Sequence, residues 1–340
     1  MSGAPVGTAP GPRGELAPGA GDARRRVLVG YGLTAAAYII FGAIGALVRM
    51  TTAPESVVLV IRMGLTAFIL AALFARRGFF DDLRRPGIAP RLLLMGVLDA
   101  AALILFFYAL RTTSVAIGMF LLFAAPVYVA VAAPRIVGQR TDRVVWGALP
   151  LALAGLALIL VPGFAGEDVA VSGLGLLAGV AGGIVFAVFL MVSKLLTRHV
   201  RNSTFLVTEC TLDTLFLLPL ALWQWSGVDF SISRHDLIVS AVLGIVCTAL
   251  AYSLWIEGLR RVRVQHASIL GYLEPVSAPF YALLLLGEAP TTTTLAGGAL
   301  IVAAGVLVVV LGAPEPGAAG ELIPGRGARA YGVIGPELPP

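Results

Sequence analysis

The stretch GYLEPVSAPFYALLLLGE, residues 271–288, places a carboxylate and two prolines in a run of sequence that is otherwise apolar. Glu274 lies about nine residues into the apolar run 266–286, which at ~1.5 Å per residue is near the middle of a membrane-spanning helix. An ionisable group at that depth costs about 2.5–3.5 kcal/mol and usually faces a cavity or a partner. Pro275 and Pro279 remove backbone donors. The stretch predicts a kinked, cavity-lining helix; the alternative is a kink that only shapes packing, with Glu274 neutral.

The composition of the chain points to a membrane protein. Of its 340 residues, 58% are hydrophobic and 13% are charged, whereas a soluble chain of this size is about one quarter charged. Apolar runs long enough to cross a bilayer recur along the sequence. We therefore expect an all-α integral membrane protein with ten transmembrane helices, at 27–49, 56–75, 92–110, 114–133, 144–162, 173–195, 204–224, 237–257, 266–286 and 292–311.

The distribution of basic residues predicts how the chain threads the membrane. With the N-terminus in the cytoplasm, 20 of the 24 Lys and Arg residues fall in the inner tails and loops. This is the bias that cytoplasmic loops of membrane proteins show. It also explains the net charge of +5 without nucleic acid as a partner. We expect a multi-pass protein of the cell membrane with both termini in the cytoplasm.

The two halves of the chain repeat one another. With residue n set against residue n+149, Leu110-Arg111 matches Leu259-Arg260, Pro126-Val127 matches Pro275-Val276, and Gly138 matches Gly287. Five helices per half is an odd number, so the halves would cross the membrane in opposite directions, as in many secondary transporters. The expected organisation is a disordered tail (1–26), a first repeat (27–162), a second repeat (173–312) and a second disordered tail (313–340), with both tails cytoplasmic.

The repeated segments resemble a known family. YALRTTSVAIGMFLLFAAPVYVAV (108–131) and the segment from Ile256, through Leu273-Glu274-Pro275-Val276 and Gly287-Glu288, are similar to the two EamA-type repeats of the drug/metabolite transporter superfamily. The resemblance covers residues 27 to 312 and implies a ten-helix transporter of small metabolites, often working outward. One position departs from the pattern: the first repeat reads Gly138-Gln139 where the family usually has Gly-Glu.

Four further ionisable residues lie within the predicted spans. Asp99 and Arg62 each lie roughly a third of the way into their helices, where they could pair, because unpaired charges are disfavoured there. A structural ion pair and a substrate contact are equal alternatives for them. Glu209 and Asp213 are four residues apart and share one helical face. Two such carboxylates do not both ionise readily in a low dielectric, so the pair suits proton coupling. The alternative is that the pair lines a water-exposed entrance.

Other residues are candidates for lining the cavity. Pro126, the repeat partner of Pro275, would free the carbonyl group of Leu122 in the fourth span. Tyr108 and Tyr272 carry hydroxyl groups that need partners, so we favour them over the neighbouring phenylalanines.

The function predicted from these features is secondary active transport. The substrate would be a small polar or amphipathic metabolite, such as an amino acid or a drug-like amine, exported by alternating access with proton coupling as an option. The alternatives are a non-transporting receptor or scaffold and, more remotely, a membrane-embedded enzyme. The three histidines are scattered and lack metal-ligand spacing, so neither a metal nor a cofactor is expected. The lipid bilayer and the substrate are the expected partners, and a homodimer is left open.

Overall fold

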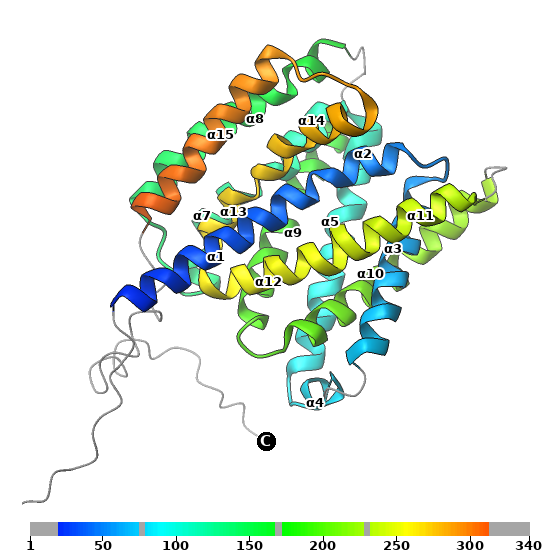
Figure 1. Ribbon diagram of the computed structural model, residues 1–340, viewed down its shortest axis with the longest axis horizontal. Helices are drawn as coiled ribbons and strands as arrows, with labels where there is room; N and C mark the ends of the chain where they lie inside the picture. Colours follow the sequence, from blue (N-terminus) through cyan, green and yellow to red (C-terminus); the bar gives the residue numbers. More distant parts are fainter. Residues whose placement is uncertain (1–19, 75–78, 167–171, 228–231, 313–340) are drawn as a thin grey trace, which may run out of the picture.

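The computed structural model describes residues 20–74, 79–166, 172–227 and 232–312. Every regular element within these ranges is a helix, and the helices form one bundle (Figure 1). The fold class predicted from the sequence is therefore confirmed. α1 begins at Ala20, so residues 20–26, which the sequence placed in a disordered tail, form the first turns of a helix. The rest of both predicted tails lies outside the described residues.

The helices follow one another with short connections. Those of the N-terminal half are α1 (Ala20–Phe41), α2 (Ala43–Arg49), α3 (Glu55–Phe74), α4 (Phe79–Leu83), α5 (Ile88–Thr112), α6 (Val115–Phe123), α7 (Ala125–Ile136) and α8 (Arg143–Gly166). Those of the C-terminal half are α9 (Gly173–Leu196), α10 (Asn202–Gly227), α11 (Arg234–Val242), the π-helix η1 (Leu243–Leu250), α12 (Ala251–Arg261), α13 (Val264–Leu270), α14 (Leu273–Leu286) and α15 (Thr292–Leu311).

The described residues contain ten helical stretches that are long and apolar enough to span a membrane, as predicted. They are Arg24–Arg49, Ser56–Leu73, Ile88–Thr112, Val115–Ile136, Arg143–Pro162, Gly173–Leu196, Asn202–Gln224, Arg234–Arg261, Val264–Leu286 and Thr292–Leu311. Their ends differ from the predicted ends by four residues or fewer. Large apolar side chains such as Phe68, Leu284 and Val310 remain exposed on the outside of the bundle, as expected where lipid is the solvent.

Three of these spans are interrupted between two α-helices, and the interruptions contact one another through Gly42 with Ser277 and through Phe123 with Tyr272. The first span breaks at Gly42, where a side chain would overlap Ser277 and the carbonyl group of Glu274 on α14. The fourth breaks at Ala124, just before Pro126, and the ninth breaks at Gly271 and Tyr272, just before Pro275. The break between α13 and α14 lies within the stretch for which the sequence predicted a kink. The carbonyl oxygen of Gly271 accepts a hydrogen bond from the N–H of Glu274 (3.1 Å), so it is not left open.

The helix pairs follow the pattern of a two-fold relation between the halves. α3 packs along α10, and α8 packs along α15, so in each pair a span meets its own repeat partner. α5 packs along α9, and α1 packs along α12. Exchanging the halves converts the α5–α9 pair into the α12–α1 pair, as an inverted repeat requires. Figure 1 shows α8 and α15 side by side at one edge of the bundle, with the broken helices between that edge and α3–α10.

Candidate functional site

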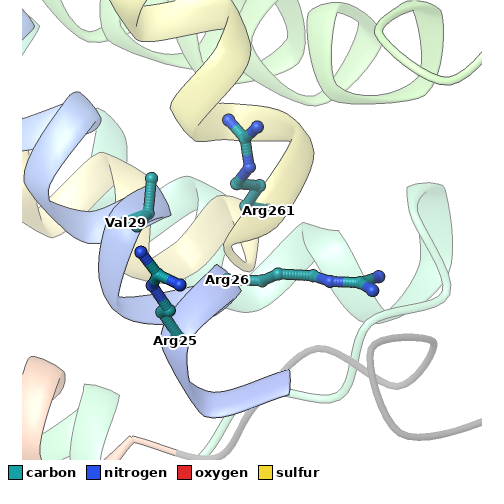
Figure 2. Close-up of a pocket in the computed structure, with 4 residues that line it drawn as sticks. All are labelled: Arg25, Arg26, Val29 and Arg261. Atoms are coloured by element: carbon teal, nitrogen blue, oxygen red, sulfur yellow. The ribbon is translucent and has the colours of Figure 1, made fainter. Parts of the chain in front are cut away.

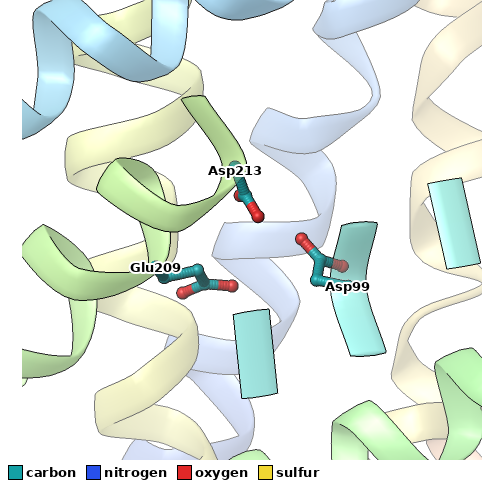
Figure 3. A group of neighbouring side chains, drawn as sticks. All are labelled: Asp99, Glu209 and Asp213. Carbon is teal, nitrogen blue, oxygen red and sulfur yellow. The ribbon is translucent and has the colours of Figure 1, made fainter. Parts of the chain in front are cut away.

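Three acidic side chains from two helices meet in the interior of the bundle. Asp99 comes from α5, and Glu209 and Asp213 come from successive turns of α10 (Figure 3). One carboxylate oxygen from each lies within 4.8 Å of the other two. The helices can approach here because Gly96, one turn before Asp99, leaves room for the side chain of Leu212. We call these three residues the acid cluster.

The acid cluster lies deeper than the sequence suggested. Asp99 is the twelfth of 25 residues in α5, and Asp213 is the twelfth of 26 in α10, so both are near mid-helix. Asp99 is 6% exposed, Glu209 1% and Asp213 0%. A water-exposed entrance, the alternative reading of the α10 pair, does not fit this burial.

The acid cluster has few hydrogen-bond partners outside itself. Within the described residues, neither carboxylate oxygen of Glu209 has a hydrogen bond, and Asp213 interacts with the side chain of Asp99, which is itself an acid. Arg62 on α3 is 6% exposed, and its Nε is likewise without a partner there. Among the described residues, no ion pair joins Arg62 to Asp99. The charge of Arg62 nevertheless acts on both Asp99 and Asp213. Buried charges without hydrogen bonds are strongly unfavourable, so this arrangement calls for a proton or a ligand.

Glu274 belongs to the same polar region but not to the acid cluster. It is the second residue of α14 and is half-buried at the break between α13 and α14. The charge of Arg62 acts on Glu274 as well as on the acid cluster. The charge of Arg62 therefore acts on both acidic regions, one on α5 and α10 and the other on α14.

The predicted cavity-lining residues have different environments. Tyr272 is 0% exposed, its ring centroid lies 6.4 Å from that of Phe123, and its hydroxyl group has no hydrogen-bond partner among the described residues. Pro126 and Pro275 are buried at the start of their helices, and Pro279 is half-buried within α14. Tyr108, by contrast, is 45% exposed on α5. Tyr272 therefore lies at the helix break, and Tyr108 lies on the surface of the bundle.

Sequence reasoning missed a buried polar network at one end of the bundle. Asp142 accepts from Arg263 Nη1 (2.7 Å) and bonds with His266 Nε2 (3.0 Å). The hydroxyl group of Tyr31 bonds with His266 Nδ1 at 2.6 Å. The signal was present in the polar loops GQRTD (138–142) and RVRVQH (261–266). Nothing in a single sequence, however, shows that these two loops touch.

A second anchoring carboxylate, Asp82, holds the α4 segment against the start of α10. Asp82 Oδ2 accepts from the backbone N–H of Arg201 (3.0 Å) and from the hydroxyl of Thr204 (2.9 Å). Burial alone would raise the pKa of Asp82. The two hydrogen bonds and the charges of Arg201 and Arg85 outweigh burial and lower its pKa below the usual value.

One pocket lies where α1 meets α12 and shares no residue with the acid cluster. It has a volume of about 320 Å³ and is lined by Arg25, Arg26, Val29 and Arg261, where the start of α1 meets the end of α12 (Figure 2). Its three arginines lie at the end of the bundle that the basic residues predict to be cytoplasmic, and the guanidinium group of Arg26 points away from those of Arg25 and Arg261 (Figure 2). The pocket reflects this charge bias and contains none of the predicted site residues.

Comparison with known proteins places the chain in a family. The model of the EamA-like transporter family matches residues 28–161 and again residues 173–311. The chain therefore belongs to the EamA-like transporter family, and its ten apolar helices make it a multi-pass membrane protein. The resemblance seen in the two repeats is confirmed.

Several curated relatives carry matching names. A protein of Archaeoglobus fulgidus named "Uncharacterized transporter" is 30% identical over 192 residues, which are 54% of this chain and 63% of that protein. The "Uncharacterized transporter YwfM" of Bacillus subtilis is 26% identical over 200 residues, 58% of this chain and 66% of that protein. The aligned chain spans less than two thirds of the length of either relative.

The fold is shared with a solved structure. A protein known from its crystal structure superposes with a TM-score of 0.70 at 19% sequence identity, covering 85% of this chain and 98% of that one. At this identity the likeness speaks for the fold alone.

Proposed function

We propose that the protein is a secondary active transporter that exports a small metabolite carrying an amino group, by alternating access and in exchange for protons. The substrate class comprises amino acids, related compounds and drug-like amines. The observation that carries the proposal is the acid cluster of Asp99, Glu209 and Asp213 at mid-helix.

The charge of the acid cluster supports a cationic cargo. Three ionised carboxylates beside Arg62 would leave a net charge of −2 in the interior. Two carboxylates separated by about 5 Å repel by about 3 kcal/mol even at an effective dielectric constant of about 20. The region is therefore stable only when protons or a cationic group compensate the charge. A site that holds either protons or the cationic group of a substrate, but not both at once, exchanges a proton for a cationic substrate.

The position of the site supports alternating access. Asp99 and Arg62 belong to the first half of the chain, and Glu209, Asp213 and Glu274 belong to the second. In transporters with inverted repeats, the binding site lies near the midplane, where the halves meet. The broken helices around Gly42, Ala124 and Gly271 supply the irregular backbone that such sites use. Residues 27–162 and 173–312 would then move as the two halves.

The charges of the tails and loops support one orientation. Their excess of basic residues on the predicted inner side supports a cell-membrane protein with both termini in the cytoplasm. A reporter fused after residue 312 should be active only in the cytoplasm. A reporter active only on the outer face would overturn the ten-span topology.

The test of the proposed function is counterflow in proteoliposomes. Vesicles loaded with unlabelled amino acids, nucleobases or amphipathic amines are assayed for uptake of the corresponding labelled compound, with empty vesicles as the baseline. We expect amino compounds to exchange and neutral nucleobases not to. Asp213→Asn should keep counterflow at equal pH and lose only transport driven by a pH gradient, whereas its matched control Glu257→Gln, which alters a carboxylate on α12 outside the acid cluster, should keep both. Absence of counterflow for every compound would favour a receptor or scaffold, and a released chemical product would favour an enzyme.

A further inference from the structure

The loop that follows α7 is docked on the start of α13. The side-chain oxygen of Gln139 accepts from the backbone N–H of Val264 at 3.0 Å. The side chain of Gln265 donates to the carbonyl oxygen of Gln139 at 2.7 Å. Gln139 is 2% exposed, and Gln265 is 1% exposed. These contacts join the first half of the chain to the second. We call the loop 138–142, together with the start of α13, the latch.

An ion network reinforces the latch. Arg263 Nη1 donates to the carbonyl oxygen of Arg140 and to Asp142 Oδ1, both at 2.7 Å. The carboxylate of Asp142 can only accept, so His266 Nε2 carries the proton in their 3.0 Å bond. The neutral ring then accepts from the hydroxyl group of Tyr31 at Nδ1. His266 is 0% exposed, and Arg263 is 8% exposed. Charge-assisted bonds of this kind are stronger than hydrogen bonds between neutral groups.

The repeat supplies an equivalent loop at the opposite end. In the register of n and n+149, Gln139 corresponds to Glu288 and Val115 corresponds to Val264. Gly138 (φ 73°) and Gly287 (φ 74°) end α7 and α14 in the same left-handed conformation, which a glycine adopts without strain. The two loops therefore leave their helices in the same way.

The equivalent loop nevertheless has different partners. Glu288 pairs with Arg49 Nη1 (2.7 Å) and Nη2 (2.5 Å), and the two side chains are 48% and 59% exposed. An ion pair so open to solvent contributes little to stability. The present structure is therefore fastened firmly at the latch and only weakly at Arg49 and Glu288.

We propose that the loops at Gln139 and Glu288 are the two gates of the transporter, and that they close in turn. In the opposite state, Glu288 leaves Arg49 and docks on the start of α6 beside Val115, while Gln139 leaves Val264. An inverted repeat produces this exchange, because each half adopts the conformation that the other half has left. The inference rests on the proposed alternating access, and it names the residues that must separate in each cycle.

Thiol cross-linking tests the exchange directly. In a Cys210→Ala, Cys247→Ala background, one variant carries Gln139→Cys with Val264→Cys, and another carries Glu288→Cys with Val115→Cys. A short bifunctional thiol reagent is applied to the full-length protein in proteoliposomes, with and without a transported substrate. We expect both pairs to cross-link in separate fractions of the population, and each cross-link to abolish counterflow. Glu257→Cys with Arg261→Cys, one turn apart on α12, is the control pair that should react in every state.

An effect at the opposite end of the protein distinguishes a gate from a contact that only stabilises the fold. Asp142→Asn weakens the latch without placing a cysteine in it. We expect this change to increase cross-linking of the Glu288 and Val115 pair at the other end by at least about threefold, which is ~0.65 kcal/mol of population shift. Glu257→Gln should leave that cross-linking unchanged. No cross-linking of Glu288→Cys with Val115→Cys in either background would overturn the gate assignment. If the wild type shows no counterflow for any compound, the proposed function fails. Cross-linking of the two cysteine pairs is measured without transport, so its result tests the gates separately from the proposed function.

Discussion

The acid cluster and the Glu274 break are two acidic regions that face the same arginine, and they are built differently. The acid cluster joins three carboxylates on continuous helices, α5 and α10, and is 6% exposed or less at every member. The break carries a single carboxylate, half-buried, beside Pro275 at the start of α14. The first region concentrates charge that must be compensated, and the second combines one charge with irregular backbone. We therefore propose that protons and the cationic group of the substrate compete at the acid cluster, and that Glu274 adds a further substrate contact where the backbone changes conformation.

The largest expected effect is that of Asp213→Asn. The amide keeps the shape of the side chain but cannot release a proton, so uphill transport driven by a pH gradient should fall about 100-fold, or ~2.7 kcal/mol. Substrate exchange at equal pH should persist, and expression should change little. The measurement is counterflow and gradient-driven transport across a pH series. An unchanged pH profile in both Asp213→Asn and Glu209→Gln would remove the acid cluster from any coupling role.

A smaller effect is expected at the break. Glu274→Gln removes a charge but not the helix break, so the protein should insert normally, because an amide is less costly than an acid in the membrane. We expect gradient-driven transport and exchange to fall together by about tenfold, ~1.4 kcal/mol, because a binding contact is lost in both. If exchange survives and only uphill transport is lost, Glu274 is a coupling residue and the division between the two regions is wrong.

The backbone at the break can be tested without altering charge. Pro275→Ala restores an N–H that can compete for the carbonyl oxygen of Gly271, which now accepts from Glu274. We expect a straighter ninth span and a turnover reduced about threefold, ~0.65 kcal/mol, with an unchanged apparent affinity for substrate. Transport rates with substrate concentration varied separate the two quantities. A wild-type turnover would mean that the break only shapes packing.

The sequence predicted the ten spans and each acidic residue of the site, but not which residues meet. Glu209 and Asp213 share a helical face, and their spacing alone indicates this. Asp99 joins them only because α5 packs against α10 at Gly96, which is a tertiary contact. Arg62 was expected beside Asp99, and its charge does act there, but the two do not form an ion pair among the described residues. The latch escaped prediction for the same reason, since His266 and Asp142 are 124 residues apart.

The smallest expected effect concerns folding stability, through Asp82 on α4, which lies outside the membrane-spanning helices. The pKa of Asp82 is lowered on folding, so its contribution to stability is present above the unfolded pKa of about 4 and is lost as the pH falls through the folded value. Asp82→Asn should lower the melting temperature of the detergent-solubilised protein at pH 7, by a few degrees. The gap from the wild type should narrow below about pH 4. A gap independent of pH would show that the hydrogen bonds to Arg201 and Thr204 do not depend on the charge.

Proton release on substrate binding tests the central claim most directly. The purified protein, in weakly buffered detergent solution with a pH-indicator dye, is mixed with an amino compound identified by counterflow. If the acid cluster exchanges protons for a cationic group, the wild type releases protons on binding, and Asp213→Asn releases markedly fewer at saturating substrate. Glu257→Gln should behave as the wild type. Saturable binding by the wild type with no proton release at any pH from 5 to 8 would contradict the account.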